Sequence, residues 1–366
     1  MKKVLFLVID NLAKGGAEVL LAGTLPKLNE KYSVILITLT NECEFNTNEI
    51  LFEKKYTLGF NNKLSFFSCV RKLRKIIKET HPSLIHSHLF YSSLIARWAC
   101  PSNIPLVYSL HNEMSKNVFN NSKVLTYLEK KTVKKNHAVI AVSKEVLRDY
   151  ENTIGKNNSS FILHNYISDV FFRGSLVKAY PKPIQRINII AAGNIKTQKN
   201  YAYLIKAFSL LKDFNVTLDI YGYGKDEVIK AFQKEIDQNN LPINFKGQAH
   251  HIHELLPQYD LYVSSSKHEG FGIATVEAMA SGLPVLLSDL PVYHEITFNN
   301  ALFFDIQDSG SFQNLIKQIF ENKYDLNELS KKGIDIAKKY TKEIYLKKLL
   351  NIYDHLLKIP KRDQEI

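Results

Sequence analysis

Short runs of aliphatic and β-branched residues alternate with amphipathic stretches of helical length along most of the chain. Five runs occur in the first half, at residues 4–9, 33–39, 83–87, 105–110 and 137–142. Five more occur in the second half, at residues 187–193, 216–222, 243–247, 260–265 and 283–288. Because strands that alternate with helices form βα units, the pattern predicts an α/β fold with two parallel sheets.

The chain of 366 residues is too long for one core of ordinary size, so two domains are expected. Residues 168–186 show no clear periodicity and contain two prolines, as a linker does. We predict a first domain over residues 1–170, a linker over 171–186 and a second domain over 187–340. Apolar residues at three- and four-residue steps predict a C-terminal helix within residues 341–366, which we expect to return to the first domain.

The composition is that of a soluble globular chain, with 45% hydrophobic and 23% charged residues. No apolar run reaches the roughly 18 residues that a membrane-spanning helix needs. The opening stretch MKKVLFLVID reads as a strand rather than a signal peptide. The three cysteines lack CxxC spacing and therefore indicate neither a disulfide framework nor a metal site, as is typical of a protein in a reducing environment. We therefore expect a cytoplasmic protein, which could work at the inner face of the membrane.

Positive charge is concentrated in the first half of the chain. Residues 1–180 carry 25 Lys and Arg against 14 Asp and Glu, a net charge of +11. Residues 181–366 carry 23 against 22, a net charge of +1. The asymmetry indicates that the first half meets an anionic partner, such as a membrane surface, a phosphate-bearing substrate or nucleic acid.

The stretch HEGFGIATVEAMASGLPV places Glu269 in a glycine-rich loop after a predicted strand and Glu277 about one turn into the following helix. Loops at the carboxyl ends of parallel strands bind ligands in open α/β sheets. Glycines permit a close approach of backbone to ligand, and the N–H groups of a first helical turn suit phosphate. Carboxylates accept hydrogen bonds from vicinal hydroxyls. Without further context, such a pair is more often a solvated loop residue followed by a helix-start residue that the helix dipole favours.

This stretch resembles the E-x7-E signature of the retaining glycosyltransferases of family 4, which have the GT-B fold of two facing Rossmann-like domains and an interdomain cleft. The resemblance implies that Glu277 holds the ribose hydroxyls of a nucleotide-sugar and that Glu269 holds a hydroxyl of the donor sugar. It assigns the sugar and diphosphate to the backbone around Gly270, Phe271, Gly272 and Ile273.

Two landmarks in the first half agree with this resemblance. The GGAE stretch at residues 15–18 matches the family's glycine-rich turn, in which the amide of Gly16 would face the diphosphate. The SLHNE stretch places His111 just after a strand, where the family has a histidine near the donor sugar and the reaction centre. Alone, the first is as often an ordinary turn, and the second more often a structural histidine.

The second half opens with AAGNIKTQKN, which resembles the family's phosphate-binding segment. Lys199 falls on the lysine that neutralises the leaving diphosphate. Most members of the family carry arginine after the glycine, whereas this chain has the neutral Asn194. Lys196, two residues on, is the candidate to supply the missing charge. Read from the residues alone, both lysines could also be solvated ends of a loop.

Transfer of a glycosyl group from a nucleotide diphosphate needs cationic and N–H donors around the anionic leaving group. Lys199, Lys196, Gly16 and the helix amides would supply them, so no metal and no cofactor is expected. The resemblance further implies a front-face mechanism with retention of configuration. Glu269 as a covalent nucleophile remains an alternative that the residues themselves leave open.

Residues 63–79 form a basic amphipathic stretch, with Phe66, Val70, Leu73 and Ile77 on one helical face and five basic residues around the other. Such a helix could lie on an anionic bilayer, which would fit a glycan or lipid-linked acceptor in surface polysaccharide or glycolipid synthesis. The alternative is an ordinary helix that packs its apolar face on the sheet.

The leading function is therefore a hexosyltransferase that moves a hexose or N-acetylhexosamine from a nucleotide-sugar to such an acceptor. A nucleotide-sugar epimerase with the same fold would turn over the donor without an acceptor. A basic nucleic-acid-binding protein would need aromatic side chains interleaved with the charge and a salt-steep affinity. The glutamate pair supports neither alternative, and no nucleic-acid partner is expected.

Overall fold

The computed structural model describes residues 2–13, 15–45, 50–134, 136–157, 159–173 and 179–358. The chain divides into two compact units: Met1–Asn165 with Lys342–Ile366 form the first, and Tyr166–Thr341 form the second. Residues 174–178 of the predicted linker and 359–366 of the predicted C-terminal helix lie outside the described residues.

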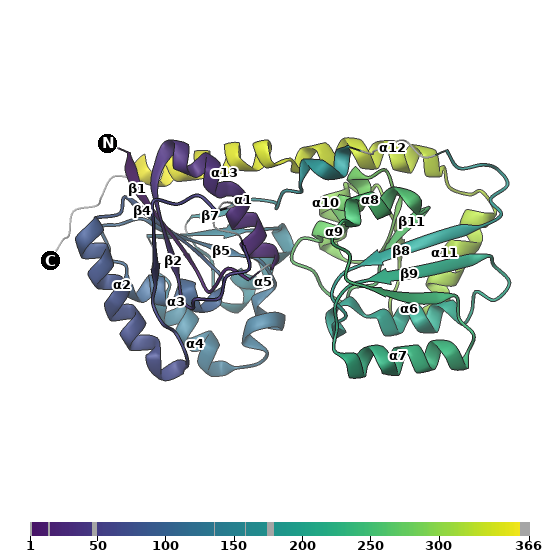
Figure 1. Ribbon diagram of the computed structural model, residues 1–366, viewed down its shortest axis with the longest axis horizontal. Helices are drawn as coiled ribbons and strands as arrows, with labels where there is room; N and C mark the ends of the chain where they lie inside the picture. The colour runs from purple at the N-terminus through teal and green to yellow at the C-terminus, as the bar shows by residue number, and fades with distance from the viewer. Residues whose placement is uncertain are drawn as a thin grey trace. The chain divides into compact units, whose positions relative to one another are not determined.

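The first unit is built on a seven-stranded sheet in the order β3-β2-β1-β4-β5-β6-β7, in which every neighbouring pair is parallel (Figure 1). The strands are β1 (Lys3–Ile9), β2 (Tyr32–Thr38), β3 (Lys54–Thr57), β4 (Leu84–His88), β5 (Leu106–Leu110), β6 (His137–Ala141) and β7 (Ser160–Ile162). The helices are α1 (Gly16–Lys31), α2 (Phe66–Thr80), α3 (Phe90–Ala99), α4 (Lys123–Thr132), α5 (Lys144–Thr153) and α13 (Lys342–Lys358).

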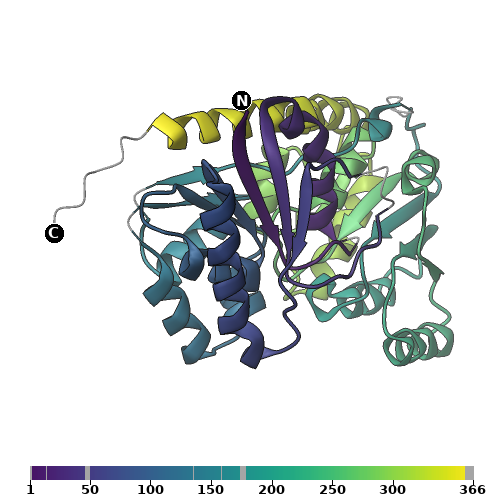
Figure 2. The same ribbon diagram turned by 60° about the vertical axis from the view of Figure 1, so that its left-hand side comes forward.

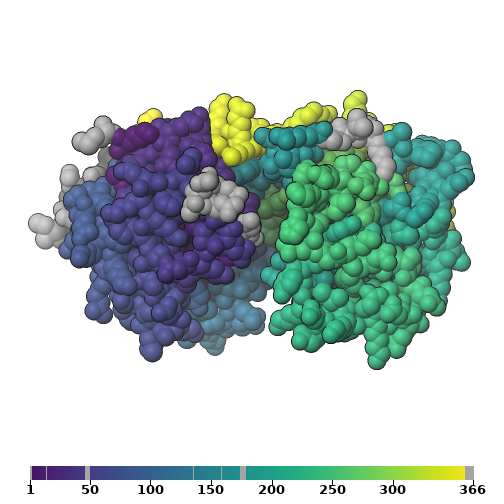
Figure 3. Space-filling view, in the orientation of Figure 1, coloured from purple at the N-terminus to yellow at the C-terminus, as the bar shows by residue number. Residues whose placement is uncertain are grey.

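The last helix, α13, belongs to the first unit although it follows the second in sequence. The Tyr353 side chain is fully buried there, with its ring edge-on to Tyr32 at 5.9 Å between centroids. Lys31 Nζ lies 2.9 Å from a carboxylate oxygen of Asp354. In the space-filling view the yellow atoms of α13 border the purple atoms of the chain's first residues (Figure 3).

The second unit is built on a six-stranded sheet in the order β10-β9-β8-β11-β12-β13, again parallel throughout. Its strands are β8 (Ile187–Ala192), β9 (Val216–Tyr221), β10 (Ile243–Gly247), β11 (Leu261–Ser264), β12 (Val285–Ser288) and β13 (Leu302–Phe304). Its helices are α6 (Tyr201–Phe208), α7 (Asp226–Gln238), α8 (Ile252–Leu255), α9 (Ile273–Ala280), α10 (Pro291–Thr297), α11 (Ser309–Phe320) and α12 (Leu326–Ala337).

All ten predicted strands are present, and the predicted α/β class with two parallel sheets is confirmed. In each sheet the first strand along the chain, β1 or β8, is central, and the chain adds strands first on one side of it and then on the other. Such a reversal opens a crevice at the carboxyl ends of the central strands, where open α/β sheets bind ligands. Ligand-binding residues are therefore expected in the loops after β1, β4, β8 and β11.

Helix α2 packs its apolar face within the first unit. Cys69, Val70, Leu73, Ile76 and Ile77 are buried, and α2 lies against α3. That face is therefore buried within the first unit, in agreement with the alternative prediction of an ordinary helix that packs its apolar face inward. The basic side of the helix stays exposed. Figure 2 shows α2 with the first unit turned toward the viewer. Among the described helices, none is both long and apolar enough to span a bilayer.

Candidate functional site

Lys199 and Glu269, 70 residues apart, meet at the carboxyl edge of the second sheet. Lys199 follows β8 at the end of a short 3-10 turn, and its Nζ lies 2.6 Å from Glu269 Oε1. The Ser266 hydroxyl donates to the same carboxylate oxygen at 2.8 Å. The Ser265 hydroxyl donates to the Lys199 carbonyl at 2.9 Å, which ties the backbone at Lys199 to the segment that leads to Glu269. The Glu269 carboxylate is thus oriented by a cation and a hydroxyl. Lys199 keeps 22% of its side chain exposed, whereas Glu269 keeps 9%.

Glycines draw the two neighbouring loops of this edge together. Ile195 N donates to Tyr223 O at 2.7 Å, which joins the loop after β8 to the loop after β9. A Cβ on Gly222 would lie 2.0 Å from the Gly193 carbonyl oxygen, and one on Gly224 would lie 2.6 Å from Ile195 Cβ. No side chain fits at either position, so the close approach of the two loops requires glycine.

Helix α9 begins directly after the glutamate loop. Gly272 caps it with φ +88°, a left-handed conformation that glycine adopts without strain. The Phe271 ring points into the unit, buried against Tyr340 at 5.4 Å between centroids, so this residue offers a ligand its backbone only. Ile273 is the first helical residue, and its amide is among those that carry the positive end of the helix dipole.

Glu277 lies on the second turn of α9 and is partly exposed. Desolvation by the surrounding protein raises the pKa of its carboxyl to about 7. A carboxylate in this state is poorly solvated, so partners that donate hydrogen bonds to it would stabilise its charged form. Asn194 and Lys196, by contrast, are both exposed on the loop after β8.

His111 and Gly16 lie in the first unit, at the carboxyl ends of its strands β5 and β1. His111 is half-buried, and its Nε2 lies 3.2 Å from Nδ1 of His88 on the neighbouring strand β4. Burial lowers the pKa of His111 to about 4, so the imidazole is neutral at physiological pH. Gly16 is the first residue of α1, and the Glu18 carboxylate folds back over Gly15 so closely that a Cβ there would meet it at 2.4 Å.

Sequence reasoning missed three residues beside the predicted ones: Ser266, which bonds to Glu269, His88, which contacts His111, and His86, whose ring lies against that of His88. Ser266 lies in an uninformative serine run. The two histidines form an H-x-H pattern on one face of β4, because alternate residues of a strand point the same way. That pattern, next to a predicted site at the carboxyl end of a strand, is the signal that could have revealed them.

Within the described ranges, one group of side chains gathers as metal ligands do. His251, His253 and Glu254 place their donor atoms within 4.8 Å of one another at the start of α8. The three residues are wholly or partly exposed and are distinct from the predicted site residues.

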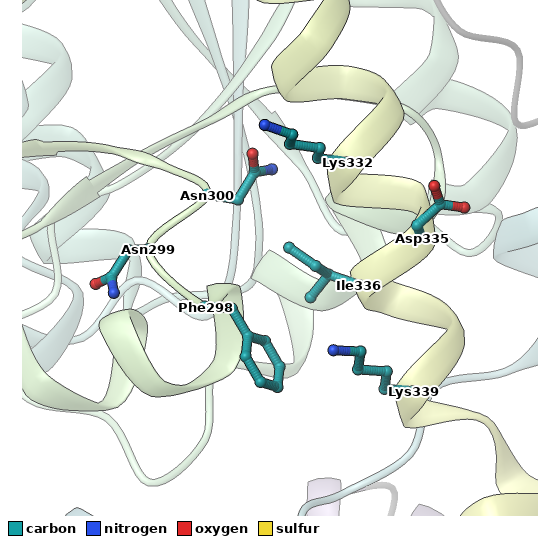
Figure 4. A pocket seen from close by; sticks show the side chains of 7 residues that line it. All are labelled: Phe298, Asn299, Asn300, Lys332, Asp335, Ile336 and Lys339. Carbon is teal, nitrogen blue, oxygen red and sulfur yellow. The ribbon is translucent and has the colours of Figure 1, made fainter.

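A surface pocket of about 390 Å³ lies elsewhere in the second unit, between the residues that follow α10 and helix α12 (Figure 4). It is lined by Phe298, Asn299, Asn300, Lys332, Asp335, Ile336 and Lys339. Lys339 Nζ already covers the Phe298 ring at 3.8 Å, and the amide of Asn300 donates to the Leu329 carbonyl. Because residues 298–300 precede β13, the pocket lies at the amino end of a strand, opposite the edge that carries Glu269.

Comparison with known proteins places both units in one class. The family model described as "Glycosyltransferase Family 4" matches residues 14–168, and that described as "Glycosyl transferases group 1" matches residues 173–339. EpsF of Bacillus subtilis, which carries the name of a glycosyltransferase, is 26% identical over 310 residues, 79% of each chain. The O-antigen chain mannosyltransferase RfbU of Salmonella typhimurium is 28% identical over 173 residues, 40% of this chain and 48% of its own.

Among solved structures, HepE of Anabaena in complex with UDP superposes with a TM-score of 0.80 at 19% identity. The match covers 96% of this chain and 100% of HepE, so it shows a common fold. The prediction of an enzyme of the hexosyltransferase class is confirmed by these relatives. The chain belongs to the glycosyltransferases of GT-B fold.

Proposed function

We propose that the protein is a retaining, metal-independent hexosyltransferase that takes a hexose or N-acetylhexosamine from a nucleotide-diphosphate sugar. The observation that carries the proposal is the Lys199–Glu269 pair at the carboxyl edge of the second sheet, just before the glycine-capped start of α9. A cation beside helix amides suits a diphosphate, and an oriented carboxylate suits a sugar hydroxyl. HepE, with the same fold, was crystallised with UDP and with UDP-glucose, which supports a nucleotide-sugar donor.

In this proposal Glu277 accepts hydrogen bonds from the ribose, and the backbone of residues 270–273 holds the sugar and diphosphate. Lys199 and Lys196 neutralise the leaving diphosphate. Asn194 stands where most members of the family carry arginine, and Lys196 supplies that charge instead. His111 contacts the donor sugar, and the amide of Gly16 faces the diphosphate. The leaving phosphate oxygen takes the proton of the acceptor hydroxyl, and the new glycosidic bond forms on the face that the diphosphate leaves.

A thermal-shift panel of UDP, GDP and their sugars tests the donor. A ligand present at 100 times its dissociation constant adds about 2.7 kcal/mol to the free energy of unfolding. We expect one nucleotide family to raise Tm and Glu277→Ala to abolish the shift. The nucleotide-sugar of that family is then incubated with a lipid-linked glycan acceptor. It should release nucleoside diphosphate and give a product with the anomeric configuration of the donor. Turnover of the donor without acceptor would indicate an epimerase instead. If no nucleotide or nucleotide-sugar raised Tm, the proposal would be contradicted.

The acceptor is proposed to be a glycan or a lipid-linked glycan of a surface polysaccharide. The relative RfbU is named for O-antigen synthesis, which supports this class of product. The first unit presents a surface suited to an acceptor at a membrane: Leu64 and Phe67, with 90% and 55% of their surface exposed, precede and begin α2. The exposed basic residues of the helix follow them, namely Arg71, Lys72, Arg74, Lys75 and Lys78.

Replacing Leu64 and Phe67 together by serine is expected to weaken binding to vesicles of anionic phospholipid by about tenfold, because two apolar anchors are lost. Co-sedimentation with vesicles at several salt concentrations measures the effect. Leu210→Ser, which removes an exposed leucine of the second unit, is the matched control and should bind as the parent protein does. Equal binding of both variants would exclude this surface as the membrane contact.

Donor affinity should rise with pH because the ionised form of Glu277 accepts the ribose hydrogen bonds. With a pKa of about 7 in the free protein, the apparent affinity for the nucleotide-sugar at pH 8 is expected to exceed that at pH 6 by about tenfold. Titration calorimetry with the nucleotide-sugar measures it, since its diphosphate diester does not titrate in this range. Glu277→Gln should bind weakly and without this pH dependence, and a flat profile for the parent protein would contradict the assignment.

Dialysis against EDTA is expected to leave the transfer rate unchanged. In the proposed site, lysine and backbone amide groups neutralise the diphosphate charge that a metal ion neutralises in other enzymes. A rate that falls with EDTA and returns with Mg²⁺ or Mn²⁺ would contradict this. His253→Ala separates any effect of added Zn²⁺ at the exposed His251, His253 and Glu254 group from an effect at the donor site.

A further inference from the structure

Three histidines of the first unit form a contiguous cluster across strands β4 and β5. The His86 and His88 rings lie 4.1 Å apart between centroids, and those of His88 and His111 lie 5.4 Å apart and are stacked. His86 is anchored on both ring nitrogens, by the Tyr353 hydroxyl at 2.6 Å and the Ser109 hydroxyl at 2.8 Å. His88 is 2% exposed and contacts His111 through Nδ1.

The second ring nitrogen of His88 decides how the pair shares its proton. Nε2 of His88 is buried and has no hydrogen-bond partner among the described residues. Both imidazoles are neutral, because burial lowers the pKa of each. One proton therefore lies between His88 Nδ1 and His111 Nε2, and each ring carries its single N–H on one nitrogen only.

The two possible arrangements differ in the group that is left without a partner. If His111 donated, the N–H of His88 would sit on the buried Nε2 as a donor with nothing to receive it, an arrangement that folded proteins rarely tolerate. If His88 donates through Nδ1, only a lone pair is left unpaired in the interior. The second arrangement places the N–H of His111 on its Nδ1, for which no protein partner is described.

We infer that His88 is a positioning residue that holds His111 as the Nδ1–H tautomer, so that His111 presents a hydrogen-bond donor to an oxygen of the substrate. His111 lines a cavity of about 50 Å³ and keeps part of its surface exposed, so this donor can meet a ligand there. A neutral donor of fixed direction can stabilise charge that grows on a substrate oxygen. The inference rests on the proposed function for the role of His111, and on contacts within the first unit for the role of His88.

Three substitutions at residue 88 test the inference. The side-chain amide of Asn reaches the place of Nδ1, whereas that of Gln reaches the place of Nε2. His88→Asn is therefore expected to keep kcat within about threefold, and His88→Gln and His88→Ala are expected to lower it about 10- to 100-fold, as loss of the outer partner of a functional histidine does elsewhere. The KM for the nucleotide-sugar should change by less than about threefold, because the contacts proposed to hold it are mainly those of Lys199, Glu269 and Glu277.

A long-range ¹H–¹⁵N spectrum of the full-length protein reads the tautomer directly. His111 should carry its proton on Nδ1 in the parent protein and in His88→Asn, and should lose this preference in His88→Gln. A proton on His111 Nε2 in the parent, or equal spectra and rates for the Asn and Gln variants, would overturn the inference. The spectrum can be recorded without turnover. If the parent protein were inactive with every nucleotide-sugar, the proposed function would be refuted, and the tautomer of His111 would still show whether His88 sets it.

Tyr353→Phe provides the matched control. It removes the hydroxyl bound to His86 from the same cluster and leaves His88 and His111 in place. The tautomer of His111 and kcat should both be unchanged in this variant. A change as large as that in His88→Gln would attribute the effect to packing of the cluster and overturn the specific role of His88.

Discussion

Replacement of Lys199 by alanine is expected to lower kcat by about 10²- to 10³-fold, with a smaller effect on donor affinity. The diphosphate gains negative charge as the glycosidic bond breaks, and removal of one positioned donor at such a charge typically costs this much. Lys199 is the half-buried lysine of the loop after β8, held in place by Glu269 at 2.6 Å. Steady-state and single-turnover measurements with a saturating nucleotide-sugar separate the rate from the affinity.

Lys206→Ala removes an exposed lysine from the helix that follows Lys199 and serves as the matched control, with kcat expected to be unchanged. Lys199→Arg should restore part of the rate because it keeps the charge. Full activity in Lys199→Ala would remove this residue from the mechanism. A loss confined to donor affinity would make Lys199 a binding group only.

The largest effect on stability is expected from Arg97, in the first unit. Arg97 and Glu129 form an ion pair in which both side chains are 1% exposed, and Glu129 also accepts from the Tyr150 hydroxyl at 2.8 Å. Arg97→Met leaves the Glu129 carboxylate buried without its cation. We expect the free energy of unfolding to fall by about 3–5 kcal/mol.

Urea unfolding followed by fluorescence measures this loss, because the single tryptophan of the chain, Trp98, adjoins Arg97 and reports on the first unit. Replacing both Arg97 and Glu129 by methionine should recover much of the loss, since no unpaired charge is then buried. Arg148→Met removes an arginine that is 64% exposed in its pair with Glu145 and should change the free energy by no more than about 0.5 kcal/mol. Equal effects at positions 97 and 148 would contradict the argument.

Within the residues that the structure describes, three strands escaped prediction from the sequence, and all three lie at sheet edges. They are β3, β7 and β13, with four, three and three residues. A central strand of a parallel sheet is covered on both faces and therefore reads as a continuous apolar run. An edge strand such as KKYT carries polar residues and has no such run. Its pairing with β2 is established by the tertiary structure rather than by its own composition.

The candidate site divides in the same way. Glu269, Glu277 and the glycines between them are close in sequence, so a strand-loop-helix reading places them together. The contact of Glu269 with Lys199 joins residues from two strands that are adjacent in the sheet although 70 residues apart in the chain. No local pattern encodes that pairing. The support of His111 by His88 is likewise a contact between neighbouring strands.

The sequence by itself determined the class of fold, because hydrophobic periodicity follows directly from which faces of each strand and helix are covered. It also determined the order of the motifs that mark a glycosyltransferase. Only the tertiary structure decided which charges meet, that the apolar face of α2 packs within the first unit, and that the carboxyl of Glu277 has a raised pKa. Desolvation and ion pairing depend on neighbours from distant parts of the chain, and the fold alone brings those neighbours into contact.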